Sequence, residues 1–343
     1  MKKYLIPPTG SFYKANLHCH STVSDGALTP EELKEVYKAA GYSVLAYTDH
    51  DVLIPHPELA DEDFLPLNGF EVEINEDRDT IWPNIRTCHL CMIALEPDNL
   101  TQPCWHRTKY ATIGNAAKYA HLVKFDENEP DYERSYTPEC VSDVMKRGRD
   151  AGFFITYNHP AWSLEEFPQY INYHNMHAME ISNTGCLVGG YDDYSPRVYD
   201  DMLRHGEKIY AVSADDNHNA ADPNTGNWDS CGGWVMIKAE KLEYRAITKA
   251  LEEGHFYASQ GPVIHNVWFE DGEIHVECDP AENIKFYYGN REGKAVFADG
   301  NTLTHASAKV ADHNIYVRIT VTDEKGRPAN TSAYYVEDLF KQD

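Results

Sequence analysis

Two histidines and an aspartate stand close together near the start of the chain. His18 and His20 are two residues apart, and Asp25 follows just before a glycine, Gly26. Alternate side chains of an extended strand point to the same face, so we expect the two imidazoles side by side and the carboxylate on the following turn. Imidazole and carboxylate groups bind divalent cations in catalytic sites. The triplet alone is weak evidence, so the hypothesis of a metal site depends on further donors of this kind.

Further imidazoles and carboxylates lie in or directly after short apolar runs that we predict to be strands. His50 follows the run 43–48, and His159 follows the run 153–157. With the opening triplet, the candidate metal ligands are His18, His20, Asp25, His50, Glu71, His89, His159, Asp216 and His218. These nitrogen and oxygen donors favour zinc, manganese or iron in a catalytic site over a closed cysteine site. Nine ligands exceed what one ion takes, so we expect two or three ions.

An alternation of predicted strands and helices positions these donors. The segment 29–41 begins with a capping box formed by Thr29 and Glu32, which indicates the start of a helix. The segments 137–152 and 199–206 also have helical patterns. Alternating strands and helices predict an α/β fold with a parallel sheet, and the number of units favours a closed barrel. In such barrels the chemistry gathers at the carboxyl ends of the strands, where several of the candidate ligands fall.

Two segments depart from this alternation. Residues 96–136 are rich in aromatic side chains and lack a clear strand, which favours an ordered lid with a helix near 113–123. After residue 262 the chain consists of short alternating runs separated by Asp-Gly, Gly-Asn and Lys-Gly turns, the pattern of a small antiparallel β-sandwich. We therefore predict a barrel domain over 1–262 and a sandwich module over 263–343.

The composition limits the classes of partner. The 343 residues include 30 basic and 55 acidic ones, and the formal charge of −25 disfavours binding to nucleic acid. No apolar run is long enough to span a membrane, and the amino terminus lacks the apolar core of a signal peptide, so we expect a cytoplasmic protein. Eight cysteines are too few for a disulfide framework and are interpreted as reduced, mostly buried thiols. The oligomeric state is left open.

Five separated motifs together resemble the PHP family, the "polymerase and histidinol phosphatase" superfamily of metal-dependent phosphoesterases. In chain order they are His18-x-His20 with Ser24-Asp25-Gly26, Thr48-Asp49-His50, Gly69-Phe70-Glu71, Asn158-His159-Pro160 and Asp216-x-His218. The resemblance covers residues 14–262. The segment 232–262 and the β-module after it are similar to the CehA/McbA-type metallohydrolase branch. The resemblance implies a distorted (β/α)7 barrel with a trinuclear metal site.

The resemblance also implies how the ligands would be shared among the ions. The first ion would be held by His18, His20, Glu71 and Asp216, the second by Asp25, His50 and His218, and the third by Glu71, His89 and His159. Asp25 stands where some members of the family carry histidine. The segment between Glu71 and His89 differs in length from the family's pattern. Asp49 is expected to orient His50 or a water molecule as a candidate catalytic residue, with Asn158 in a similar role.

Other charged residues near these motifs receive simpler interpretations. Glu73 shares a face with Glu71 and is read as an orienting or solvated acid, and Asp215 is expected to cap or orient the backbone. Four cations fall in segments expected over the active face, and each is more often a solvated charge than a phosphate clamp: Arg107, Lys118, Arg134 and Arg197.

The leading hypothesis is therefore a metal-dependent hydrolase that cleaves a small phosphomonoester or phosphodiester with a metal-bridging hydroxide. One alternative is hydrolysis of a non-phosphorus ester, carbamate or amide, which the CehA/McbA-like segment suggests. Another alternative is a protein that binds carbohydrate or protein through its sandwich. We expect a small-molecule substrate, phosphorylated under the leading hypothesis.

Overall fold

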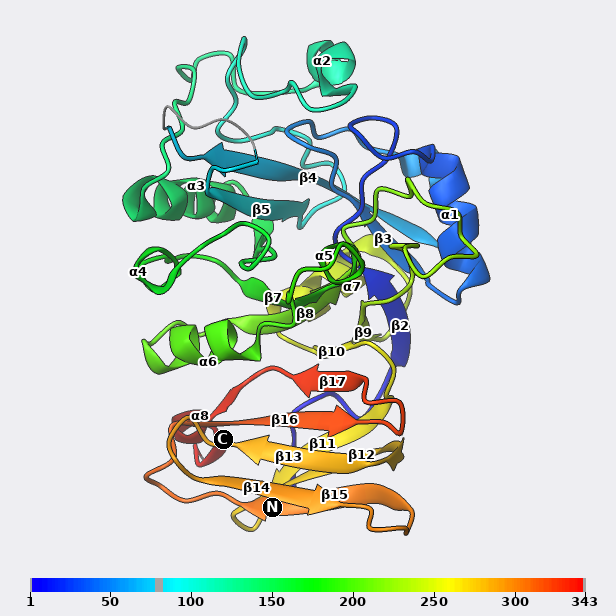
Figure 1. Ribbon diagram of the computed structural model, residues 1–343, viewed down its shortest axis with the longest axis vertical. Helices are drawn as coiled ribbons and strands as arrows, with labels where there is room; N and C mark the ends of the chain where they lie inside the picture. The colour runs from blue at the N-terminus through cyan, green and yellow to red at the C-terminus, as the bar shows by residue number, and fades with distance from the viewer. Residues whose placement is uncertain (1, 78–82, 342–343) are drawn as a thin grey trace.

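The computed structural model describes residues 2–77 and 83–341 and contains two regions that share a continuous sheet. An α/β region, residues 11–259, occupies the upper part of Figure 1, and a C-terminal β region, from residue 264 onward, occupies the lower part. Among the described residues, no helix combines the length and the apolar character that a membrane crossing requires.

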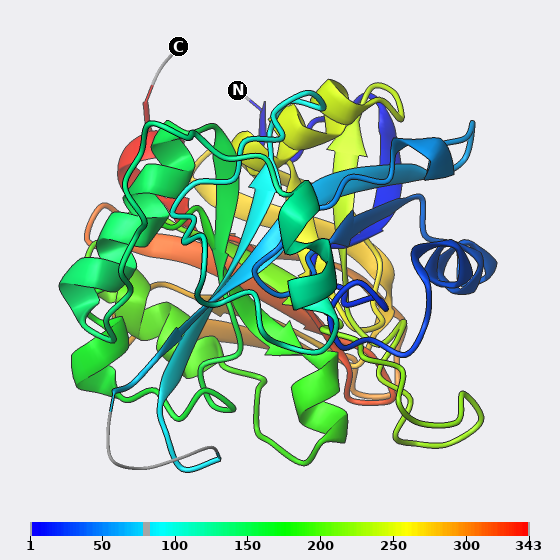
Figure 2. The same cartoon turned by 90° about the horizontal axis from the view of Figure 1, so that it is seen from above.

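The α/β region contains nine strands among the described residues. They are β2 (Ser11–Asn16), β3 (Val44–Tyr47), β4 (Leu65–Asn75), β5 (Thr87–Ala94), β6 (Phe153–Tyr157), β7 (Ala178–Asn183), β8 (Tyr210–Ala214), β9 (Trp234–Ala239) and β10 (Phe256–Ser259). Its helices are α1 (Pro30–Ala39), η1 (Pro57–Leu59), α2 (Ala116–Tyr119), η2 (Ala120–Leu122), α3 (Pro138–Asp150), α4 (Phe167–Tyr170), α5 (Thr184–Val188), α6 (Pro196–Arg204) and α7 (Tyr244–Glu252). Seen from above, the helices α1, α3, α6 and α7 lie around the outside of the strands (Figure 2).

The strands of this region are hydrogen-bonded in the order β10-β9-β2-β3-β4-β5-β6-β7-β8. The terminal strand β8 also contacts β9 and β10, so the two ends of the series approach each other. The α/β class and the β-rich C-terminal region are confirmed. Complete closure into a (β/α)7 barrel stays a prediction.

The sheet is mixed, so the expectation of a parallel sheet is wrong for β5 and β9. β5 pairs antiparallel with both β4 and β6, and β9 pairs antiparallel with β2. Only residues 76–86 separate β4 from β5 along the chain, fewer than a parallel crossover connection needs, so antiparallel pairing is favoured. As a result, the first residues of β5 lie beside the last residues of β4.

Local sequence signals placed the first helix correctly. The Thr29 side chain accepts a hydrogen bond from the Glu32 backbone N–H at 3.2 Å, and Glu32 accepts one from the Thr29 N–H at 2.9 Å. This reciprocal pair is the capping box expected from the sequence, with Pro30 at the first helical position. The segment expected to be helical near 113–123 contains α2 and η2.

The lid segment 96–136 is ordered against the loop that carries Asp25. The backbone N–H of Asn115 donates to the Ser24 carbonyl at 2.6 Å, and the Asn115 side chain donates to the Thr22 carbonyl at 3.0 Å. Gly114 has a φ of 54°, and a Cβ at this position would lie 2.1 Å from the Ser24 carbonyl oxygen. Only glycine therefore permits this close approach.

The C-terminal β region is a sandwich of two antiparallel sheets. Its described elements are β11 (Ile264–Glu270), β12 (Glu273–Ala281), β13 (Asn283–Tyr287), β14 (Gly293–Phe297), β15 (Leu303–Lys309), β16 (Tyr316–Thr322), β17 (Pro328–Thr331), β18 (Tyr334–Tyr335) and α8 (Val336–Leu339). One sheet has the order β1-β11-β12-β15, where β1 is Lys3–Tyr4, and the other contains β14-β13-β16-β17. Buried aliphatic and aromatic side chains from both sheets form the core between them.

Three features cross the predicted domain boundary at residue 262, which remains a proposal. The amino-terminal strand β1 pairs with β11, and β17 pairs with β10, so that one sheet runs through both regions. The buried guanidinium of Arg318 on β16 also forms a bidentate ion pair with Asp200 on α6, with N–O distances of 2.8 and 2.7 Å. The two regions are therefore joined by backbone hydrogen bonds and by a buried charge pair.

Candidate metal centre

The nine predicted ligands converge at one end of the α/β region. His18 and His20 come directly after β2, and His50 and the pair Asp216 and His218 come after β3 and β8. β2 ends at Asn16, before the histidines that we expected within a strand, but Cys19 bridges to Asn217 and keeps the segment extended. The two imidazoles therefore still lie on one side.

Glu71 lies at the centre of the group. It is fully buried within β4, and its carboxylate oxygens lie 3.1 to 3.4 Å from five imidazole nitrogens. These imidazoles belong to His18, His20, His50, His89 and His159. Asn158 additionally donates a hydrogen bond of 2.7 Å to Glu71 Oε1. One carboxylate thus connects five of the other eight candidates.

His89 reaches this centre because of the antiparallel turn between β4 and β5. Its Cα lies opposite that of Glu73, and its Nδ1 lies 3.2 Å from Glu71 Oε1. A parallel β5 would have presented its carboxyl end here instead of its third residue. Strand direction thus accounts for the position of His89 beside Glu71, although the segment before it differs in length from the family's pattern, and its role as a ligand stays a prediction.

Asp216 provides a second buried carboxylate. Its Oδ1 lies 3.0 Å from His20 Nε2 and 3.2 Å from His18 Nε2, and its Oδ2 lies 3.7 Å from His159 Nε2. Its φ of 52° places it in the left-handed region, which is unusual for a residue other than glycine. Such strain is characteristic of functional sites.

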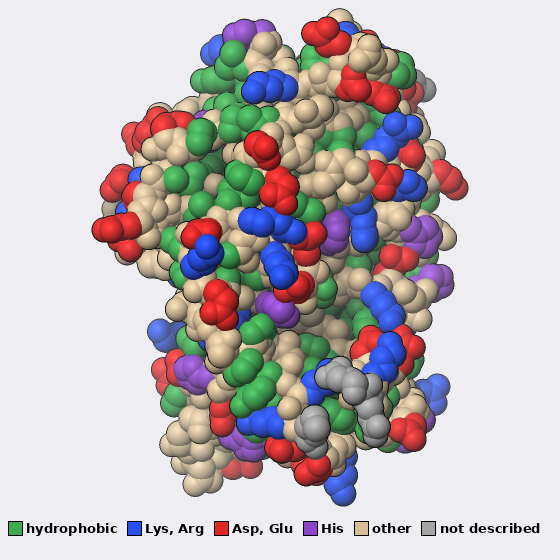
Figure 3. All heavy atoms as spheres, turned by 180° about the vertical axis from the view of Figure 1, so that it is seen from behind, with side chains coloured by type: hydrophobic (Ala, Val, Ile, Leu, Met, Phe, Trp, Pro, Cys, Tyr) green, Lys and Arg blue, Asp and Glu red, His purple; other side chains and the backbone are tan. Residues whose placement is uncertain are grey.

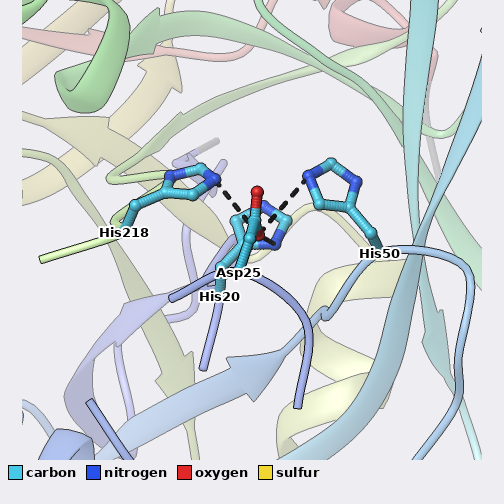
Figure 4. A group of neighbouring side chains, drawn as sticks. All are labelled: His20, Asp25, His50 and His218. Carbon is cyan, nitrogen blue, oxygen red and sulfur yellow. Dashed lines mark ion pairs between the residues drawn. The ribbon is translucent and has the colours of Figure 1, made fainter. Parts of the chain in front are cut away.

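A third group lies nearer to solvent and is shown in Figure 4. Asp25 Oδ1 lies 3.5 Å from His218 Nε2 and 3.8 Å from both His50 Nε2 and His20 Nδ1. His20 contacts both groups, since its Nε2 faces Asp216 while its Nδ1 faces Asp25. The side chain of Asp25 is about a third exposed, so this group lies at the mouth of the site.

The spacing of these donor atoms suits shared cations. Two ligand atoms that are each about 2.1 Å from one ion lie about 3.0 to 3.4 Å apart. Many of the donor-atom separations around Glu71 and Asp216 fall in this range. Within the described part of the chain, four sets of donor atoms each lie within 4.8 Å of one another, namely His20-Asp25-His50-His218, His18-His159-Asp216, His18-Glu71-Cys91 and His50-Glu71-His89. These sets overlap with the three expected from the resemblance but place His20 with Asp25 and His50 with Glu71. The division among ions stays a prediction.

Unpartnered buried atoms support a cation at the centre. His50 Nδ1, Glu71 Oε2 and both ring nitrogens of His89 are buried and make no hydrogen bond of acceptable geometry, despite the close approaches around Glu71 given above. Buried polar atoms normally find partners, because an unpartnered one costs about 1–3 kcal/mol. Cys91 lies nearby, but burial raises the pKa of its thiol, and all eight cysteines are free, six of them buried. The residues present therefore fit a divalent cation held by nitrogen and oxygen donors.

The pKa values of the candidate ligands are shifted by burial and by the charges of their neighbours. Burial acts to raise the pKa of Glu71 and of Asp216, yet nearby imidazoles, His18 foremost, hold both well below the usual range. Burial conversely acts to lower the pKa of His18, but Asp216 and other charged groups raise it well above normal. Burial and the charge of His20 lower the pKa of His50 to about 3. The buried carboxylates and imidazoles thus favour each other's charged forms, and this concentration of carboxylate charge suits bound cations.

Glu180 is a functional residue that the sequence interpretation missed. It lies in β7, its Oε1 accepts from His18 Nδ1 at 2.7 Å, and its Oε2 accepts from the His159 N–H at 3.1 Å and from Asn183 at 2.9 Å. A carboxylate that accepts from one ring nitrogen fixes the other nitrogen as the metal donor. A lone acid within the apolar strand HAMEISN was the signal that could have identified it.

We expect Glu180→Gln to lower metal affinity and turnover about 10- to 100-fold, because an amide satisfies fewer of the donors around this carboxylate. Metal titration of the variant and kcat/KM for an aryl phosphate would measure the loss. The exposed Glu62→Gln should leave both unchanged. Equal metal affinity in Glu180→Gln and the wild type would contradict the orienting role.

Asp49 holds the loop that carries Asp25. Its Oδ1 accepts from the backbone N–H groups of Ser21 and Ser24 at 2.8 and 3.0 Å, and their hydroxyls also donate to its carboxylate. These bonds orient the loop, and the expected role of Asp49 in orienting His50 or a water molecule stays a prediction. Asp215 accepts from the backbone N–H groups of residues 231 to 233, the capping role expected of it.

Glu165 fixes the loop that follows His159. Its carboxylate accepts from the hydroxyls of Tyr136 at 2.8 Å, Tyr157 at 2.5 Å and Tyr173. Burial raises the pKa of Glu165 from 4.5 to about 7, although these hydroxyls act in the opposite direction. A raised pKa means that the folded state binds a proton that the unfolded state has lost.

The raised pKa of Glu165 contributes to the stability of the folded state below about pH 4.5, and this contribution is lost as the pH rises through about 7. Relative to Glu165→Gln, which stays neutral, we expect the wild type to lose unfolding free energy between pH 5 and pH 8. Thermal unfolding of both proteins at several pH values measures the difference. The exposed Glu166→Gln should follow the wild type, and parallel curves for Glu165→Gln and the wild type would refute the assignment.

A cavity of about 460 Å³ opens above the candidate ligands. All of the nine except His18 and His20 line it. The four cations that we interpreted as solvated charges rather than phosphate clamps do not line this cavity: Arg107 pairs with Asp131, Lys118 with Asn115, Arg134 with Asp51 and Arg197 with Asp201. On the opposite side of the molecule from Figure 1, acidic and basic side chains are interspersed (Figure 3).

Comparison with known families matches residues 16–224 to the PHP domain, which is more than half of the chain and spans every candidate ligand. The chain belongs to the PHP domain family. An error-prone DNA polymerase of Mycobacterium tuberculosis is 33% identical over 125 residues, and a 3',5'-nucleoside bisphosphate phosphatase of Chromobacterium violaceum is 36% identical over 86 residues. These segments are 35% and 24% of this chain but only 10% and 28% of the length of the two relatives.

Among solved structures, this PHP domain chain is similar to a two-domain protein from Bacteroides vulgatus, described as containing a predicted PHP-like metal-dependent phosphoesterase. The likeness covers 94% of both chains at 14% identity, with a TM-score of 0.45.

Proposed function

We propose that this chain is a metal-dependent phosphoesterase that hydrolyses a small phosphomonoester or phosphodiester. The observation that carries the proposal is the convergence of five imidazoles on the buried carboxylate of Glu71, with unpartnered nitrogen and oxygen atoms beside it. Membership of the PHP domain family supports it, as does similarity to a relative named as a bisphosphate phosphatase.

The residues of the chain have separate tasks in this proposal. Glu71 and Asp216 would hold divalent cations, and Asn158 and Glu180 keep Glu71 and His18 in place through hydrogen bonds. Bound divalent cations lower the pKa of a water molecule towards neutrality and offset charge on the phosphoryl oxygens. Asp25 and His218 lie at the mouth, where an ester oxygen could approach from solvent.

The test combines metal analysis with a substrate panel. The purified chain should contain zinc, manganese or iron, release phosphate from part of a phosphoester panel, and lose this activity on chelation and regain it on metal return. Aryl esters and carbamates belong in the same panel. Cleavage of these compounds without any phosphate release would overturn the proposal in favour of the non-phosphorus hydrolase.

A further inference from the structure

Besides seven of the candidate ligands, the cavity above the candidate metal centre is lined by partly or fully exposed residues of a different character, which form its outer half. Apolar side chains from four separate parts of the chain form its wall, and two acids stand beside them. The apolar residues are Ile85, Ile113, Trp162 and Tyr191, and the acids are Glu73 and Asp229. A bound molecule that extends outward from the floor must therefore pass between aromatic and aliphatic surfaces.

No lysine or arginine is among the described residues that line this cavity. The nearby Arg134 is buried and engaged, since it pairs with Asp51 at 2.6 Å and donates to the Glu73 carbonyl at 2.8 Å. Asp229 accepts from the backbone N–H groups of His218 and Asn219, and Glu73 accepts from the Asn75 side chain. Among the described residues, the outer half thus offers acidic and apolar groups but no side-chain cation.

We propose that the cavity selects substrates with one anionic group joined to an apolar arm, and discriminates against substrates with a second phosphate. This inference rests on the proposed function for the position of the first anionic group, at the cations on the floor. A second phosphate would lie between apolar walls and two carboxylates, where its lost hydration is not replaced by paired charges. An aromatic or branched aliphatic arm would instead bury apolar surface against Trp162 and Tyr191.

Non-hydrolysable phosphonates separate these contributions. Calorimetric titration of the metal-loaded chain would compare methylphosphonate, benzylphosphonate and p-xylylenediphosphonate, the last of which adds a second phosphonate at the far end of the ring. We expect benzylphosphonate to bind about tenfold or more tightly than methylphosphonate, from the added apolar burial. We expect the diphosphonate to bind about tenfold or more weakly than benzylphosphonate.

Two substitutions test the residues named. Glu73→Lys places an ammonium group at the outer half and should bring the diphosphonate to at least the affinity of benzylphosphonate, while Glu73→Gln should have a smaller effect. Tyr191→Ala should lower the ratio of benzylphosphonate to methylphosphonate affinity, and Tyr191→Phe should retain it.

The outcomes distinguish this inference from the proposed function. Failure of benzylphosphonate to bind, or a diphosphonate that binds the wild type as tightly, overturns the selectivity. Phosphonate binding in the expected order without turnover of any phosphoester supports the selectivity and overturns the proposed reaction. Phosphoester turnover with equal affinity for all three phosphonates supports the proposed reaction and overturns the selectivity.

Discussion

Glu71→Gln should abolish most metal binding and reduce turnover by about 10³-fold or more. Changes in residues that only orient a ligand cost about 10- to 100-fold, and Glu71 itself contacts five imidazoles, so its loss should cost more. The amide removes the negative charge on which the shared cations depend and turns an N–H donor towards imidazole nitrogens. Elemental analysis of the purified variant and kcat/KM for an aryl phosphate measure both effects.

The matched control for this variant is Glu139→Gln, an exposed position on α3. It should keep the metal content and activity of the wild type. Circular dichroism should show that Glu71→Gln is folded, so that lost activity reflects the site. A folded Glu71→Gln that retains full metal content and turnover would refute the metal centre proposed here.

Asp200→Ala should destabilise the protein by about 3–5 kcal/mol, because it leaves the buried Arg318 guanidinium without its counter-charge. The Arg318 side chain is only 2% exposed and lies over the ring of Tyr287, so water cannot easily replace the carboxylate. The hydroxyl of Tyr316 also loses the acceptor that it meets at 2.7 Å. Urea denaturation at pH 7, followed by fluorescence, measures the change in midpoint.

Two further variants separate the lost charge pair from a general effect. The exposed Asp192→Ala should remain within about 0.5 kcal/mol of the wild type. The double variant Asp200→Ala with Arg318→Met should recover part of the stability, because replacing both charges with apolar groups removes the unpaired ion. Equal stability of Asp200→Ala and the wild type would show that the ion pair contributes nothing to joining the two regions.

The ends of the strands were the most predictable part of the structure. Apolar runs that end in Asp49-His50 or Asn158-His159 mark where a buried strand emerges at the sheet edge, and the structure ends β3 and β6 there. The capping box of Thr29 and Glu32 likewise encoded the start of α1 within four residues. Signals of this kind are local, because each depends on neighbours along the chain.

Features that depend on distant partners were not predictable in this way. The direction of β5 is defined by its pairing with β4 and β6, which its apolar run alone does not encode. Glu180 acts through His18, which lies 162 residues away in the sequence. The pairing of β17 with β10 joins segments that belong to different predicted domains. The hydrophobic periodicity of one segment does not indicate which distant strand or side chain it will contact in the fold.

The continuity of the sheet through β10 and β17 bears on how the chain can be divided. A polypeptide cut after residue 262 would keep β10 but lose the strand that covers its outer edge. Exposed edge strands recruit other chains, so the shortened protein should self-associate rather than yield an isolated enzyme. The strand β17 of the sandwich thus protects an edge of the sheet whose other strands position the candidate ligands.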